Sequence, residues 1–244
     1  MSRTLLVTGA SGGIGRAICE MAADRWNVAV HYHGNEAGAM ATVDAVERRG
    51  GTAEAFAADL ADSSEATDLV ASTVSTFGNV DALVNSAGVF YDAALSEYDE
   101  PMYDRTFGVN MDGAYHCSRA AVERMLSTDA SADGVAGRVV SVSSTAGTHG
   151  GPKDAVYAAS KGALTAFTKS LARAYADAGI LANVVSPGPT DTGMLSAERT
   201  ELAAGAIPLG RVADPAEVAD VVETCLETTF MTGQVIEING GLYT

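Results

Sequence analysis

The chain has 244 residues, a length that suits one large α/β domain with a buried core, so we expect a single domain over residues 1–244. Its 31 acidic residues against 15 basic ones give a formal net charge of −16, which disfavours nucleic acid and anionic membranes as general partners because like charges repel. The N-terminus enters an apolar strand-like stretch without a signal-peptide pattern, and no apolar run is long enough for a membrane span, so we expect a cytoplasmic protein.

Short β-rich runs alternate with helical stretches along the chain. The pattern predicts strands over residues 4–8, 28–32, 52–57, 82–85, 138–143, 181–186 and 235–239. It predicts helices over residues 13–25, 36–50, 63–77 and 155–178. This alternation favours an α/β fold, a doubly wound Rossmann-like parallel sheet of about seven strands with helices on both faces. The least regular stretches are 127–137 and 187–210.

Cysteine and histidine spacing gives no metal or disulfide pattern. Cys19, Cys117 and Cys225 are odd in number and far apart, so we expect reduced, packed thiols. His31 in the predicted strand and His33 just after it stand two residues apart but lack further ligands, so no metal site is predicted.

Glycines follow the first predicted strand and lead into a helix. Gly9, Gly13 and Gly15 stand where a dinucleotide-binding loop needs residues without side chains, because the backbone must approach a pyrophosphate closely. The N–H groups and the positive dipole end of the following helix would bind that anion.

A tyrosine and a lysine stand four residues apart in an alanine-rich predicted helix. Tyr157 and Lys161 therefore share one helix face. A nearby positive charge favours the ionised phenol, so we expect the pair to act as an acid/base with a lowered tyrosine pKa. Taken alone, the same pair is also compatible with chance in a helix of this composition.

Several motifs together resemble the short-chain dehydrogenase/reductase family. They are "TGASGGIG" at residues 8–15, "NSAG" at 85–88, "GVNMDG" around Asn110, "SVSSTAG" around Ser144, "YAASK" at 157–161 and "SPGPTDT" at 186–192. They occur in the family's order and span nearly the whole chain. The resemblance implies an enzyme that uses NAD(P)(H) to interconvert a ketone and a secondary alcohol by hydride transfer.

The resemblance also implies catalytic roles for four residues. Tyr157 would donate the proton to the carbonyl oxygen, and Lys161 would lower the phenol pKa and bind the nicotinamide ribose. Ser144 would hydrogen-bond the substrate oxygen, and Asn110 would hold a water that connects Lys161 to solvent. Two alternatives stay open, since Ser143 is adjacent to Ser144 and asparagine also caps or kinks helices.

The cofactor residues implied by the resemblance lie after the strands. They are Gly9, Ser11, Gly13, Ile14, Gly15, Tyr32, His33, Asp59, Leu60, Asn85, Ala87, Gly88, Tyr157, Lys161, Pro187, Gly188, Thr190 and Thr192. Thr190 and Thr192 are equally compatible with a simple turn. Tyr32 stands where an acid would select NAD, and His31, His33, Asn35 and Arg16 are the nearby groups that would welcome a 2′-phosphate, so the sequence favours NADP(H) over NAD(H).

The substrate is less sharply indicated. The overall resemblance, including "IPLGR" and "TGQVIEINGG", is to 3-oxoacyl-thioester reductases acting on acyl carrier protein or coenzyme A thioesters. Docking of acyl carrier protein is doubtful because the expected rim carries Asp129, Asp133 and Asp177 and no cation, while that partner is acidic. A sugar, polyol or other small-alcohol dehydrogenase and a non-catalytic dinucleotide sensor or scaffold remain as alternatives. The resemblance further implies a homotetramer.

Overall fold

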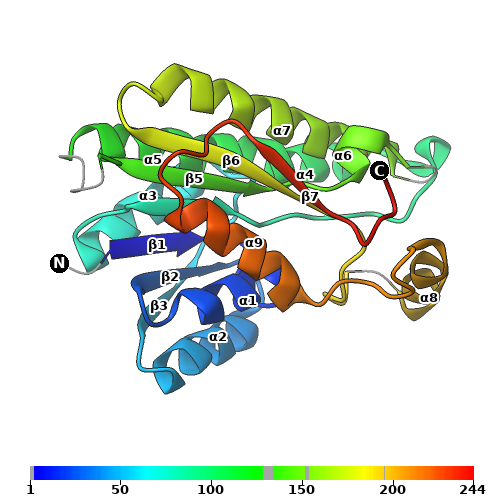
Figure 1. Ribbon diagram of the computed structural model, residues 1–244, viewed down its shortest axis with the longest axis horizontal. Coiled ribbons are helices and arrows are strands. Elements are labelled where there is room, and N and C mark those ends of the chain that lie inside the picture. Colours follow the sequence, from blue (N-terminus) through cyan, green and yellow to red (C-terminus); the bar gives the residue numbers. More distant parts are fainter. Residues whose placement is uncertain (1–2, 129–133, 152–153, 195) are drawn as a thin grey trace.

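The computed structural model describes residues 3–128, 134–151, 154–194 and 196–244. Within these residues a seven-stranded parallel sheet has the order β3-β2-β1-β4-β5-β6-β7 (Figure 1). The strands are β1 (Arg3–Val7), β2 (Trp26–Tyr32), β3 (Thr52–Ala57), β4 (Ala82–Asn85), β5 (Gly137–Val142), β6 (Ile180–Pro187) and β7 (Val235–Ile238). Each begins and ends within two residues of the predicted strand, and the predicted doubly wound fold is confirmed.

Helices connect the strands and cover both faces of the sheet. They are α1 (Gly13–Ala22), α2 (Glu36–Arg48), α3 (Ser63–Phe77), the short turn η1 (Leu95–Glu97), α4 (Glu100–Phe107), α5 (Ala114–Leu126), α6 (Ala146–His149), α7 (Ala155–Tyr175), α8 (Ala197–Ala206) and α9 (Pro215–Glu227). A π-helical turn, η2 (Gly108–Gly113), joins α4 to α5. None of the helices in the described part of the chain has both the length and the apolar character needed to cross a membrane.

Alternating strand residues build two separate cores. Leu5 and Val7 of β1 face a cluster that includes α1, α2 and α9, whereas Leu6 faces a cluster that includes α3, α5 and α7. Side chains alternate across a strand, so a sheet buried on both sides needs an almost continuous apolar run, as in "LLV". The three cysteines are free thiols buried in these layers, as the sequence predicts for packed thiols.

The segment 187–210 contains a helix, so the prediction that it is irregular is partly wrong. α8 begins where the Ser196 side chain accepts a hydrogen bond from the backbone N–H of Arg199, and its alanines favour helix once it has started. No residue of α8 is buried, which explains why no amphipathic pattern indicated it. Of the other irregular stretch, Asp129 and Asp133 lie outside the described residues.

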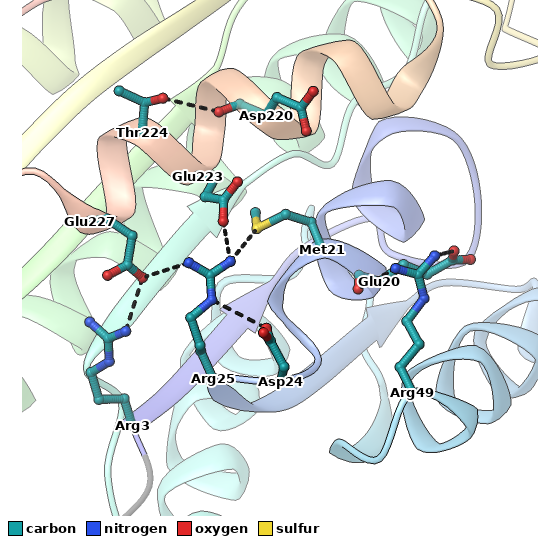
Figure 2. Close-up of polar contacts among 10 residues, drawn as sticks. All are labelled: Arg3, Glu20, Met21, Asp24, Arg25, Arg49, Asp220, Glu223, Thr224 and Glu227. Atoms are coloured by element: carbon teal, nitrogen blue, oxygen red, sulfur yellow. Dashed lines mark hydrogen bonds and ion pairs between the residues drawn. The ribbon is translucent and has the colours of Figure 1, made fainter.

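Ion pairs link α1, α2 and α9 on one edge of the molecule (Figure 2). Arg25, just after α1, contacts Glu223 of α9 and lies 3.8 Å from Glu227, which also accepts a hydrogen bond of 2.9 Å from Arg3. Arg49 beyond α2 reaches Glu20 at 3.0 Å. These side chains are partly exposed, so their attraction is weakened by solvent and salt, whereas Leu226 of α9 is wholly buried.

We therefore expect the apolar contact to outweigh the ion pairs in stability. Leu226→Ala should lower the free energy of unfolding by about 2–5 kcal/mol, and Arg25→Gln by about 1 kcal/mol or less. Urea unfolding at low and high salt measures both, and the Arg25 effect should shrink at high salt. An Arg25 loss equal to that of Leu226→Ala at both salt concentrations would contradict this ranking.

Candidate active site

A cavity of about 920 Å³ lies beyond the carboxyl ends of the strands. The strand order reverses between β1 and β4, and in open α/β sheets ligands bind at such a crossover. The predicted site residues that line the cavity are Gly9, Ser11, Gly13, Ile14, Gly15, His33, Leu60, Ala87, Gly88, Ser144, Tyr157, Lys161, Pro187, Gly188, Thr190 and Thr192. Four others, Tyr32, Asp59, Asn85 and Asn110, are not among the described lining residues.

The first glycine loop leaves no room for a side chain at Gly9 or Gly15. Gly9 has a φ of 66°, and a Cβ there would lie 2.6 Å from the Cα of Ala87. A Cβ on Gly15 would lie 2.3 Å from the carbonyl oxygen of Gly9. The fully described helix α1 has neither a side-chain cap nor an acidic residue in its first turn, so its free N–H groups and dipole can bind an anion. These features fit the pyrophosphate of a dinucleotide.

His31 of β2 links the loops after β1 and β3 beneath this site. Its Nδ1 accepts a hydrogen bond from the Gly9 N–H at 2.9 Å, which places the proton on Nε2, and Nε2 donates to the Ala58 carbonyl at 3.1 Å. The ring is buried, and desolvation lowers its pKa to about 4. Both ring nitrogens are therefore engaged by the backbone, and His31 has none left for a ribose phosphate. The sequence placed His31 near the cofactor but did not indicate this bridging role.

The adenosine end presents the exposed polar side chains of His33 and Asn35. His33 is exposed and lines the cavity. Asn35 accepts a hydrogen bond from Gly38 N–H at the start of α2, and Arg16 pairs with Glu20 at 2.8 Å instead of lining the cavity. Tyr32 packs partly buried against the core.

One nitrogen of Arg105 contacts both carboxylate oxygens of Asp59 beside the cavity. Arg105 Nη1 lies 2.6 and 2.7 Å from the two carboxylate oxygens of Asp59. Burial tends to raise the pKa of this carboxyl, but the bonds from Arg105 and from the Ala61 N–H outweigh burial and lower it. Arg105 itself lines the cavity, so Asp59 holds a cation at the wall.

Tyr157, Ser144 and Lys161 meet where β5 ends and α7 passes over it. Ser144 accepts a hydrogen bond from Ala146 N–H at 3.1 Å, and Lys161 Nζ donates to the Val142 carbonyl at 2.9 Å. Lys161 Nζ lies 5.8 Å from the centre of the Tyr157 ring. The neighbouring Ser143 bonds instead to the Lys161 carbonyl at 2.9 Å, so it anchors α7.

The ionisation of the pair differs from the sequence prediction. Burial raises the pKa of Tyr157 to about 12, although its hydrogen bond with Ser144 acts in the opposite direction. Burial also lowers the pKa of Lys161 to about 8. The pKa of Tyr157 is therefore raised and not lowered as the sequence predicts, because desolvation of the phenol dominates.

The two predicted asparagines are buried, and Asn110 holds backbone whereas Asn85 bonds to a side chain. Asn110 exchanges two hydrogen bonds with Val89, at 2.8 Å to its N–H and 3.1 Å to its carbonyl, and also donates to Ser160 at 3.0 Å. Asn85 donates to Ser118 at 2.9 Å. A Cβ on Gly88 would lie 3.4 Å from both Asn110 Oδ1 and Lys161 Nζ, so Asn110 and Lys161 flank the same loop.

The loop after β6 completes the wall. Thr190 donates to the Gly188 carbonyl at 3.0 Å, and Thr192 accepts from Met194 N–H at 3.3 Å. Thr192 also contacts the glycine loop, because a Cβ on Gly13 would lie 3.0 Å from its Cβ.

Several cavity residues had no signal in the sequence. Phe90 packs edge-on against Tyr157 with ring centres 5.3 Å apart. Arg199 of α8 stands 3.1 Å from Asp92 and 5.2 Å from the Phe90 ring centre. The C-terminal Leu242 and Tyr243 also line the cavity. Within the described residues, no group of three or more His, Cys, Asp or Glu side chains is arranged to hold a metal ion.

Comparison with known proteins agrees with this geometry. A family model described as short chain dehydrogenase matches residues 3–203. The 3-oxoacyl-acyl-carrier-protein reductase FabG of Staphylococcus aureus is 36% identical over all of this chain and 99% of its own length. An uncharacterized oxidoreductase of Thermotoga maritima is 37% identical over 98% of this chain and 96% of its own.

Solved structures give the same match. A short-chain dehydrogenase of Burkholderia cenocepacia, solved in complex with NADP, has a TM-score of 0.91 and 32% identity, covering 99% of this chain and 98% of its own. The acetoin dehydrogenase YohF of Salmonella typhimurium has a TM-score of 0.89 and 29% identity, covering 99% and 96%.

The His31 bridge predicts a graded loss of cofactor binding. In His31→Asn the amide oxygen can replace Nδ1 as acceptor for Gly9, so the NADPH dissociation constant should stay within about threefold. In His31→Gln only the bond to Ala58 can be kept, and binding should weaken about tenfold. Fluorescence titration with NADPH measures both constants, with His116→Asn, outside the cavity lining, as control. Equal losses in the Asn and Gln variants would refute the Gly9 contact as the determinant.

Proposed function

We propose that this chain, which belongs to the short-chain dehydrogenase/reductase family and is an NAD(P)-dependent oxidoreductase acting on CH–OH groups, reduces the ketone of 3-oxoacyl thioesters. The observation that carries the reaction type is that Ser144, Tyr157 and a buried Lys161 line one cavity with the glycine loop. The identity to FabG supports the substrate class. A non-catalytic sensor is disfavoured because Asn110, Ser144, Tyr157 and Lys161 are all present.

The chain's own residues would supply the proton and hold the carbonyl. The bound nicotinamide supplies the hydride that reaches the carbonyl carbon. Tyr157, with a pKa near 12, is protonated at neutral pH and can donate its phenolic proton to the carbonyl oxygen. Ser144 would steady the charge developing on that oxygen. The Lys161 ammonium would stabilise the phenolate left after transfer.

Charge bears on which thioester is used. The expected rim residue Asp177 instead lies between α7 and the start of β6, at the amino ends of the strands, and does not line the cavity. We propose a coenzyme A thioester in place of acyl carrier protein, because the whole chain carries a net charge of −16. An acidic carrier domain would meet this charge over a broad surface.

We also propose a homotetramer for this chain. Tyr103 of α4 and Tyr115 of α5 are 44% and 40% exposed, and Tyr115 packs on Phe167 of α7 with ring centres 6.1 Å apart. Aromatic side chains left partly uncovered on adjacent helices suit a contact between subunits.

Ketone reduction should depend on the protonation of both buried groups. Lys161 loses its proton as pH rises through about 8, so kcat/KM for reduction of 3-oxobutanoyl coenzyme A should be constant below that pH and fall above it.

Tyr157→Phe should lower turnover by about two orders of magnitude or more while NADPH still binds. The decrease in NADPH absorbance measures the rate in the pH profile and in the Tyr157→Phe variant. A folded Tyr157→Phe protein with unchanged turnover would rule out the phenol as proton donor.

We propose NADP(H) as the preferred cofactor, with His33 as the residue facing the 2′-phosphate. Replacing His33 by aspartate puts a negative charge at the exposed end of the cavity, so kcat/KM for NADPH should fall about tenfold while that for NADH changes little. His33→Asn is the matched neutral control. A wild-type protein that uses NADH more efficiently than NADPH would overturn this preference.

A further inference from the structure

The last residues of the chain fold back over the cavity. Gly240 and Gly241 have φ values of 62° and 88°, a left-handed pair that reverses the chain after β7. Asn239 fixes the reversal, because its side chain donates to the Tyr243 carbonyl at 3.1 Å and accepts from Gly241 N–H at 2.9 Å. Figure 1 shows the C-terminus beside α6.

A ring stack closes this tail against α6. The imidazole of His149 and the ring of Tyr243 are nearly parallel, at 7°, with centres 3.9 Å apart. His149 Nε2 lies 3.3 Å from both carboxylate oxygens of Glu237 on β7, so the imidazole is held from its edge as well as its face. His149 is five residues after Ser144 in the chain.

The tail stands at the substrate end of the cavity. Leu242 and Tyr243 line it together with Ser144, Tyr157 and the Gly150 and Gly151 backbone, whereas the adenosine end is lined by His33. Three anchors hold this wall: the glycine turn, Asn239 and the His149 stack. A wall fixed in this way limits how far a substrate can extend beyond the reacting carbonyl.

We propose that residues 242–244 are a specificity-determining wall that restricts the enzyme to short-chain ketones, which within the proposed function means short 3-oxoacyl thioesters. The identity of the substrate in this inference rests on the proposed function, whereas the position of the wall does not. The other residues at this end, Met194, Arg199 and Ala203, belong to α8 and the segment before it. No residue of α8 is buried, and Tyr243 is itself 37% exposed, so the tail is distinguished by its ring stack with His149 and its bond from Asn239 and not by burial.

The test compares a short and a long substrate in matched variants. We expect the wild-type protein to prefer 3-oxobutanoyl over 3-oxododecanoyl coenzyme A. Tyr243→Ala and deletion of residues 242–244 should raise the long-to-short ratio of kcat/KM about tenfold or more, with KM for NADPH unchanged. Tyr243→Phe keeps the stack and should keep the wild-type ratio. Phe230→Ala, which removes a fully exposed ring outside the cavity lining, is the second control.

The outcomes separate the wall from the proposed function. An unchanged or lower ratio in both Tyr243→Ala and the deletion overturns the wall, while the reductase assignment stands. If neither thioester is reduced but other ketones are, the thioester assignment fails, and the same ratio measured with butan-2-one and dodecan-2-one judges the wall. If no ketone is reduced, both proposals fall.

Discussion

The close approach of two loops at the carboxyl ends of β1 and β4 underlies the whole site. Thr8 Oγ1 accepts hydrogen bonds from the N–H groups of Ser86 and Ala87 at 3.0 and 3.1 Å, which draws the loop after β4 against Gly9. Any Cβ on Gly9 would push these loops apart, and His31 holds the same residue from the other side. Because the sheet crossover leaves both loops without a covering helix, this hydrogen-bonded contact forms the floor of the cavity on which the remaining residues are arranged.

Burial sets the chemistry of the catalytic pair more than mutual attraction does. At a separation of 5.8 Å between Lys161 Nζ and the Tyr157 ring centre, a charge in water would shift a phenol only slightly, whereas removing each group from water disfavours its charged form strongly. The result is a phenol that stays protonated and an amine that titrates near pH 8. A protonated phenol is the correct state for donating to a ketone, so the site in the free chain is suited to reduction. The reverse reaction would need the phenolate and is favoured at high pH.

The features that the sequence predicts are those that depend on periodicity and on short motifs. The strands came from apolar runs, and the glycine loop, Ser144, Tyr157 and Lys161 from spacing within motifs that fold locally. The sequence does not predict contacts that depend on tertiary placement. The His149–Tyr243 stack joins residues 94 positions apart, and the Asp59–Arg105 pair joins the loop after β3 to α4, so no local pattern encodes either. The sign of the Tyr157 pKa shift was missed for the same reason, because helical spacing gives distance to a neighbour but not the depth of burial.

The charge of the cavity wall is opposite to that of the molecule. Among the described residues that line it, Arg105, Lys161 and Arg199 stand against the single carboxylate of Asp154, whereas the whole chain carries −16. At physiological ionic strength exposed charges are screened beyond about 8 Å, so an anionic dinucleotide inside the cavity experiences the nearby cations and the start of α1 more than the distant acidic surface. The acidic surface then acts mainly while the dinucleotide approaches, because its repulsion slows association. Salt weakens that repulsion. An acidic macromolecular partner is not separated from the acidic surface, because it contacts the outer surface directly. The same charge distribution therefore permits a small anionic cofactor and disfavours an acidic protein carrier.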